Sequence, residues 1–188
     1  MSTEIYYFSG TGNSLHVAKE LQRRIPEAKL LPITGLADKE TVTSSGETVG
    51  FVFPHYASSL PKLVHAFIQK LDLGSARYLF AIATRGGTKT MAFSSFDFYY
   101  DEKCTGCGVC ESVCLAEKVQ LVGGGPVWQE AIKCHGCFAC LNFCPEESIQ
   151  VESKWYLKSY TDQNGRYHHP AITANDIAGQ KLSDILRG

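Results

Sequence analysis

Two cysteine-rich runs constrain this chain more than any other part of it. The first run holds Cys104, Cys107, Cys110 and Cys114, the second holds Cys134, Cys137, Cys140 and Cys144, and together they contain all eight cysteines. Each run has the spacing C-x2-C-x2-C-x3-C, which is typical of thiolates that bind a cubane [4Fe–4S] cluster. Because three cysteines at intervals of three lie on one tight turn, their sulfur atoms can converge on one cluster.

The fourth cysteine of each run is expected to serve the other cluster. We expect it to begin a helix that leads away from the turn, and in two-cluster ferredoxins this cysteine ligates the second cluster. The sequence thus predicts one set of ligands made of Cys104, Cys107, Cys110 and Cys144, and another made of Cys134, Cys137, Cys140 and Cys114. Gly106 and Gly136 occupy equivalent places, where glycine permits a positive φ and lets N–H groups approach sulfur.

Other uses of eight cysteines fit the pattern less well. Disulfides suit an oxidising compartment, but the N-terminus Met-Ser-Thr-Glu has neither the basic nor the apolar region of an export signal. Zinc sites usually use two CxxC pairs a dozen or more residues apart, not three cysteines within seven residues. Pro145 follows the second run, whereas Leu115 takes that place after the first. The proline is not a ligand, so this difference leaves the assignment intact.

Length, charge and composition exclude further classes of function. The chain has 188 residues, which is enough for one domain or two small ones, and its net charge is −1. No apolar run approaches the ~20 residues of a membrane helix. The lysines and arginines are scattered, which argues against nucleic acid. Free thiolates and oxygen-sensitive iron sites are expected in a reducing cytoplasm, as in an anaerobe.

The first ninety residues read as strands alternating with helices. Residues 5–8 are β-rich, the hydroxyl- and glycine-rich loop 9–14 follows, and apolar residues at helical spacing continue up to Pro26. Further strand patterns cover residues 30–33, 48–53 and 77–83, and a helical pattern covers 63–71. This alternation predicts a parallel sheet, with ligand-binding loops beyond the carboxyl ends of its strands.

The loop at residues 9–14 has the features of a phosphate site. It precedes a helix, whose N-terminus offers unpaired N–H groups and the positive end of a dipole. Ser9, Thr11, Asn13 and Ser14 add side-chain donors. The loop contains no P-loop lysine, and Leu15 stands where a dinucleotide fingerprint has its third glycine. A hydroxyl-rich loop without a cation suits a single phosphate, as in FMN.

The chain resembles the flavodoxin–ferredoxin fusion proteins of bacteria and archaea. The flavodoxin-like resemblance lies in Phe8–Ser14, Val52-Phe53-Pro54-x-Tyr56 and Ala83-Thr84-x-Gly86-Gly87, and residues 96–153 resemble a bacterial-type two-cluster ferredoxin domain. It implies that FMN binds with its phosphate in the first loop and its ring between the other two, with Tyr56 stacked on the ring. The residues so implied are Ser9, Gly10, Thr11, Gly12, Asn13, Ser14, Pro54, His55, Tyr56, Ala57, Thr84, Arg85, Gly86 and Gly87.

The resemblance also implies a domain organisation. Residues 1–93 would form an α/β flavodoxin-like domain, residues 94–153 an α+β ferredoxin domain, and residues 154–188 a tail that packs on both. A complete flavodoxin domain has a fifth strand and a final helix, which are missing here. The sheet is therefore expected to stop at four strands in the order 2-1-3-4, with a hydrophobic edge on the fourth.

In the tail, residues 174–186 are expected to form a short amphipathic helix. His168 and His169 are adjacent, and adjacent side chains seldom converge on one metal ion, so we do not expect a metal site there.

These patterns favour an electron carrier. Two [4Fe–4S] clusters would pass single electrons to and from redox partner proteins, coupled to FMN in the first domain. The sequence shows no constellation of general acid, base or nucleophile. Two alternatives stay open: a flavin-dependent reductase of a small acceptor, and a ferredoxin whose shortened flavodoxin-like part has lost FMN and only docks a partner.

Overall fold

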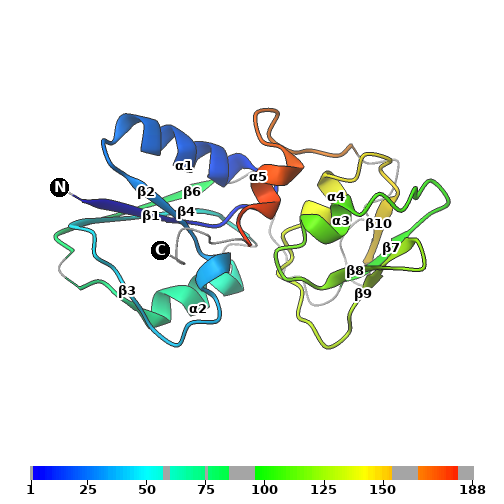
Figure 1. Ribbon diagram of the computed structural model, residues 1–188, viewed down its shortest axis with the longest axis horizontal. Helices are drawn as coiled ribbons and strands as arrows, with labels where there is room; N and C mark the ends of the chain where they lie inside the picture. The colour runs from blue at the N-terminus through cyan, green and yellow to red at the C-terminus, as the bar shows by residue number, and fades with distance from the viewer. Residues whose placement is uncertain (1, 57–59, 75, 85–95, 154–164, 182–188) are drawn as a thin grey trace.

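The computed structural model describes residues 2–56, 60–74, 76–84, 96–153 and 165–181. An α/β group of elements lies on one side, a cysteine-rich group lies on the other, and helix α5 lies between them (Figure 1). The strands are β1 Thr3–Tyr7, β2 Lys29–Pro32, β3 Val42–Thr43, β4 Thr48–Pro54, β5 Leu71–Asp72, β6 Tyr78–Thr84, β7 Phe96–Tyr100, β8 Val119–Val122, β9 Gly125–Trp128 and β10 Ile149–Ser153. The helices are α1 Asn13–Arg24, η1 Thr34–Leu36, α2 Lys62–Lys70, α3 Val109–Ser112, α4 Ala139–Asn142 and α5 Ala174–Ala178.

The main sheet is parallel and has the strand order β2-β1-β4-β6. This is the predicted order 2-1-3-4, counted over the strands of this sheet. All five residues of β1 are buried, as expected for a central strand covered on both faces. The short parallel pair β3–β5 was not predicted from the sequence.

Helices α1 and α2 cover opposite faces of this sheet (Figure 1). Helix α1 buries Leu15 and Ala18, and α2 buries Val64 and Phe67. Burying one large apolar side chain contributes about 1.5–3 kcal/mol, so the amphipathic faces of both helices hold them on the sheet. Among the described residues, no helix is long and apolar enough to cross a membrane.

The cysteine-rich half is built from two antiparallel strand pairs, β7–β10 and β8–β9, with helices α3 and α4. One prediction was wrong here, because α3 does not begin at the fourth cysteine. It begins after Gly108, which has a left-handed conformation, and it contains Cys110. Cys114 lies two residues beyond its end. Gly108 starts the helix early because it can take a positive φ without steric cost.

The two halves share one apolar cluster. Val113, Leu115 and Ala139 of the cysteine-rich half are buried in the same cluster as Phe8 of the α/β half. Ile172 and Ile177 of the tail belong to it as well. The α5 helix is shorter than the predicted 174–186: it ends at Ala178, and residues 182–188 lie outside the described part of the chain. Burial of the tail thus connects elements that are far apart in the sequence.

Candidate metal centre

Four thiols from both cysteine runs line a single pocket. Cys104, Cys107 and Cys110 come from the first run and Cys144 from the second, and we call this set the first thiol site. The pocket has about 310 Å³ of empty space, including its open mouth. Burial raises the pKa of the Cys110 thiol to about 11, and the nearby Cys144 and Cys107 act in the same direction. The structure therefore brings together the four residues that the sequence assigned to one cluster.

The other four thiols form a second group, which we call the second thiol site: Cys134, Cys137, Cys140 and Cys114. Burial raises the pKa of Cys137 to about 12, and the charges of Cys134 and Cys114 add to this. Burial likewise raises the pKa of Cys140, with contributions from Cys137 and Cys114. Cys114 thus lies near the cysteines of the other run.

The backbone around both sites makes turns with positive φ, and at the second site one N–H group points at sulfur. Gly106 and Gly136 have φ values of +69° and +66°, as predicted from their matched positions. The amide N of Gly136 donates to Cys134 Sγ at 3.3 Å. Phe138 precedes α4 and has a φ of +56°, which costs a residue with a side chain of order 1–3 kcal/mol. These conformations are needed to wrap the chain around a compact group.

The donor chemistry of both sites fits an iron–sulfur cluster. Each site offers four sulfur donors. The raised pKa values of Cys110 and Cys137 mean that these two thiols hold protons when no cluster is bound, and cluster binding would release them. The indole Nε1 of Trp128 is buried and has no hydrogen-bond partner among the described residues. Trp128 packs against the apolar cluster that contains Cys110, Cys114 and Cys140. A sulfur-rich group nearby would give this N–H an acceptor.

Comparison with known proteins agrees with this chemistry. Residues 103–149 match the family model of the 4Fe-4S dicluster domain. The match supports a ferredoxin-like half with iron–sulfur chemistry, which suggests electron transfer. No curated protein and no solved structure matches the chain.

The glycine-rich loop at residues 9–14 contacts the tail. The amide N of Ser9 donates to Gln180 Oε1 at 3.1 Å, and Gln180 Nε2 donates back to the Ser9 carbonyl oxygen at 2.9 Å. Gln180 is completely buried. One of the backbone donors that the sequence offered to a phosphate is therefore used by a side chain of the same protein.

Further tail residues cover the rest of this loop. The amide N of His169 donates to the Thr11 carbonyl oxygen at 2.8 Å, and Tyr167 Oη donates to Asn13 Oδ1 at 3.0 Å. Gly12 has a φ of +94°, and a Cβ built on it would lie 2.8 Å from the Cβ of Ile172. Ile172 is itself 1% exposed, so it sits firmly over the loop.

The loop at residues 9–14 meets the carboxyl end of β6, and the loop that follows β4 approaches the cysteines. Ser14 Oγ and Thr84 Oγ1 are 2.7 Å apart, and the amide N of His55 donates to the Thr84 carbonyl oxygen at 2.8 Å. Burial strongly raises the pKa of Tyr56, and the charge of Cys137 adds to it. The proposed flavin-stacking tyrosine thus lies near the second thiol site. Pro54, in the same loop, ends β4, while Ala57, Arg85, Gly86 and Gly87 lie outside the described residues.

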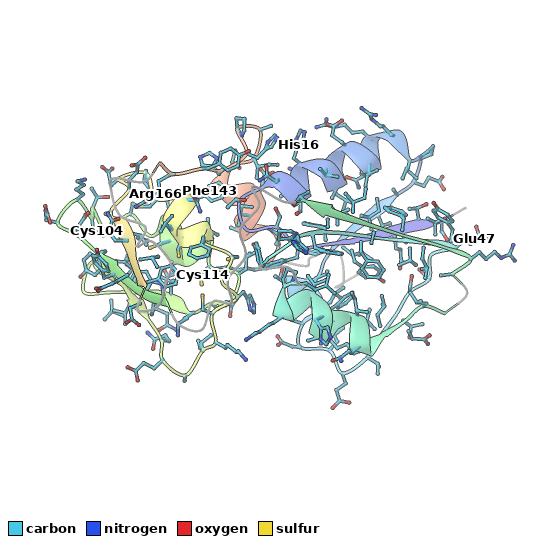
Figure 2. The ribbon with its side chains drawn as sticks, turned by 180° about the vertical axis from the view of Figure 1, so that it is seen from behind. His16, Glu47, Cys104, Cys114, Phe143 and Arg166 are labelled. Atoms are coloured by element: carbon cyan, nitrogen blue, oxygen red, sulfur yellow. The ribbon has the colours of Figure 1, made fainter. Side chains whose placement is uncertain are left out.

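Gly10 lies directly against the second thiol site. A Cβ built on Gly10 would lie 2.3 Å from the carbonyl oxygen of Cys137, and the rings of Phe8 and His135 are 6.3 Å apart in an edge-to-face arrangement. Figure 2 shows Cys104 at the outer end of the cysteine-rich half and Cys114 on the side facing the α/β half. The second thiol site is therefore the one adjacent to the α/β half.

The tail histidines take part in ring stacking. The rings of His168 and Phe143 have centroids 4.5 Å apart, and those of His169 and His16 are 3.9 Å apart. His16 belongs to the α/β half and Phe143 to the cysteine-rich half (Figure 2), so the two tail histidines stack on residues of different halves. The sequence analysis did not identify Gln180 and Ile172 as site residues, because no local motif marks them.

Proposed function

We propose that the chain is an electron carrier with two [4Fe–4S] clusters, one at each thiol site. The observation that carries this proposal is that each site combines three cysteines of one run with the fourth cysteine of the other. Eight sulfur ligands in two sets of four suit two cubane clusters. When bound, each cluster supplies one-electron redox chemistry, while the chain supplies the thiolates, the backbone donors and the surrounding charge.

The test is the metal content of an anaerobic preparation. Two clusters predict about eight irons and eight acid-labile sulfides per chain, four of each for every cluster. A variant with Cys107→Ala should keep the second cluster and lose most of the first. About four irons per wild-type chain, or zinc in place of iron, would refute the proposal.

Partner proteins are proposed to dock on the ferredoxin-like half. Residues 96–153 contain nine acidic and three basic residues, although the whole chain has a net charge of only −1. Such a concentration of negative charge steers association with a basic surface. A partner that uses this attraction should reduce or oxidise the clusters more slowly as the salt concentration rises from 50 to 500 mM, roughly as screening predicts. A rate independent of salt would argue against it.

We further propose that the α/β half is a flavodoxin-like domain whose FMN exchanges electrons with the clusters. It is supported by the four-stranded parallel sheet, by the glycine-rich loop before α1 and by the contact between Ser14 and Thr84 at the carboxyl end of the sheet. Flavin binding at this loop requires Ile172 and Gln180 to leave it, because both occupy it.

The same contacts favour a second candidate, in which the α/β half is a docking module without flavin. Titration of FMN fluorescence separates the two. If the loop is a flavin site covered by the tail, Gln180→Ala should bind FMN more tightly than the wild type, because it frees the Ser9 amide. If neither protein quenches FMN fluorescence, the docking module is the better description.

A further inference from the structure

Lys118 lies beside the second thiol site and is held in place. Its Nζ donates to the carbonyl oxygens of Gln129, at 2.5 Å, and Ile132, at 2.6 Å. These residues form the turn that leads directly to Cys134. Burial raises the pKa of Cys134, and the ammonium of Lys118 is among the groups that act in the opposite direction. Ile132 stands two residues before Cys134 and Lys118 stands four residues after Cys114, so the hydrogen bond to Ile132 holds the ammonium beside this site.

The doubled cysteine motif shows what stands at the equivalent place of the first site. Lys118 follows Cys114 by four residues, and the residue that follows Cys144 by four is Ser148. Ser148 lines the pocket of the first thiol site, where its Oγ lies 3.4 Å from Cys144 Sγ. The two sites therefore have the same number of thiols but differ in the charge beside them. A cation stands at the second site, and a neutral hydroxyl stands at the first.

We propose that Lys118 is a positioning residue that gives the cluster of the second site a higher reduction potential than the cluster of the first. This inference rests on the proposed two-cluster function. A reduced cluster carries one more negative charge than an oxidised one, so a fixed cation nearby stabilises the reduced state. Lys118 is partly buried, and its ammonium is anchored by two carbonyl groups, so solvent screens it less than a freely exposed lysine.

This difference in potential would set the direction in which an electron moves between the two clusters. The second site contacts the α/β half through Cys137 and Gly10, while the first lies at the outer end of the other half (Figure 2). An electron accepted by the first cluster would reduce the second cluster and leave the first oxidised. The exchange moves one electron and makes or breaks no covalent bond. The electron would then rest beside the α/β half.

The test is a redox titration of the full chain, purified anaerobically and followed by electron paramagnetic resonance. The wild type should show two one-electron steps. In Lys118→Met, the equilibrium constant for reduction at the step of higher potential should fall about tenfold, which is about 59 mV for a one-electron couple. The step of lower potential should keep its wild-type value. Lys118→Arg should restore the wild-type value. Lys29→Met makes the same change of net charge at an exposed position of strand β2, in the α/β half, and should move neither step.

Each other outcome has a defined meaning. Two unmoved steps in Lys118→Met, or a shift in the lower step alone, would overturn the proposal. If Lys118→Met fails to bind the second cluster, Lys118→Gln decides, because it keeps a hydrogen-bond donor and removes the charge. If Lys118→Gln fails as well, Lys118 is a structural clamp and the electrostatic role is wrong. Iron analysis of the wild type comes first, so that a chain with one cluster is recognised as a failure of the two-cluster function itself.

Discussion

Substitution of Gly12 should show how firmly the tail is docked on the glycine-rich loop. Gly12 has a φ of +94°, and in Gly12→Ala this left-handed conformation costs about 1–2 kcal/mol. The new Cβ would lie 2.8 Å from the Cβ of Ile172 and 3.0 Å from its Cγ2. Ile172 is buried, so it yields only with strain, and overpacking of this kind costs about 1–3 kcal/mol. The expected loss of stability is therefore about 2–5 kcal/mol.

A double-mutant cycle with Ile172→Ala isolates the contact. Ile172→Ala alone should cost about 2–5 kcal/mol, because it removes a buried side chain and leaves a cavity. In the double variant, the truncated side chain can move into that space and relieve the overlap. The combined loss should then be smaller than the sum of the two single losses by about 1–2 kcal/mol.

The assay is urea unfolding of the anaerobic holoprotein, followed by circular dichroism. Gly165→Ala is the matched control, since nothing lies within 4 Å of a Cβ built there and the residue is exposed. It should change stability by no more than about 0.5 kcal/mol. If the losses from Gly12→Ala and Ile172→Ala add to within about 0.5 kcal/mol, Ile172 does not sit on the loop in solution.

Three further predictions concern the thiol sites and a buried carboxylate. Cys114→Ala should damage the cluster of the second thiol site and spare that of the first, which iron analysis and paramagnetic resonance would show. Removal of iron should unfold the ferredoxin-like half, because cluster binding supplies folding free energy there; an unchanged circular dichroism spectrum would contradict this. Burial favours the neutral form of Glu4, but hydrogen bonds from Ser44, Ser45 and Tyr6 prevail and lower its pKa below 4.5. The hydrogen-bonded Glu4 carboxylate therefore stabilises the fold fully above pH 4.5, and this stabilisation is lost as the pH falls through the lowered pKa. Glu4→Gln should be less stable than the wild type at pH 7. The difference between their urea midpoints should shrink below pH 4.5.

The sheet and the thiol sites could be predicted because their signals are local. Strand β4 is an apolar run that buries Val49 and Val52, and the alternation with helices indicates parallel pairing. Cysteine spacing likewise restricts which sulfur atoms can meet. The start of α3 was misplaced, because Gly108 can begin a helix before the fourth cysteine and the spacing alone does not show this.

The tail could not be placed from the sequence because its contacts are long-range. Gln180 and Ser9 are 171 residues apart, and an isolated glutamine carries no pattern that predicts a buried partner. Lys118 was also missed as a site residue, since its role depends on the carbonyl groups of Gln129 and Ile132, which follow β9 and which the β8–β9 pairing brings to it. Only the folded arrangement shows that these polar groups satisfy one another.

The glycines of the first loop illustrate why a motif can predict a site and still leave its occupant open. A phosphate site needs glycine so that its backbone can approach the ligand, but here Gly10 is required by the Cys137 carbonyl group and Gly12 by Ile172. Replacing either glycine would disturb this packing whether or not flavin binds. A decisive variant must instead free a donor and leave the loop backbone unchanged, as Gln180→Ala does for the Ser9 amide. Flavin affinity that rises in this variant would show that tail and phosphate compete for the same N–H group, whereas unchanged affinity would place the flavin elsewhere.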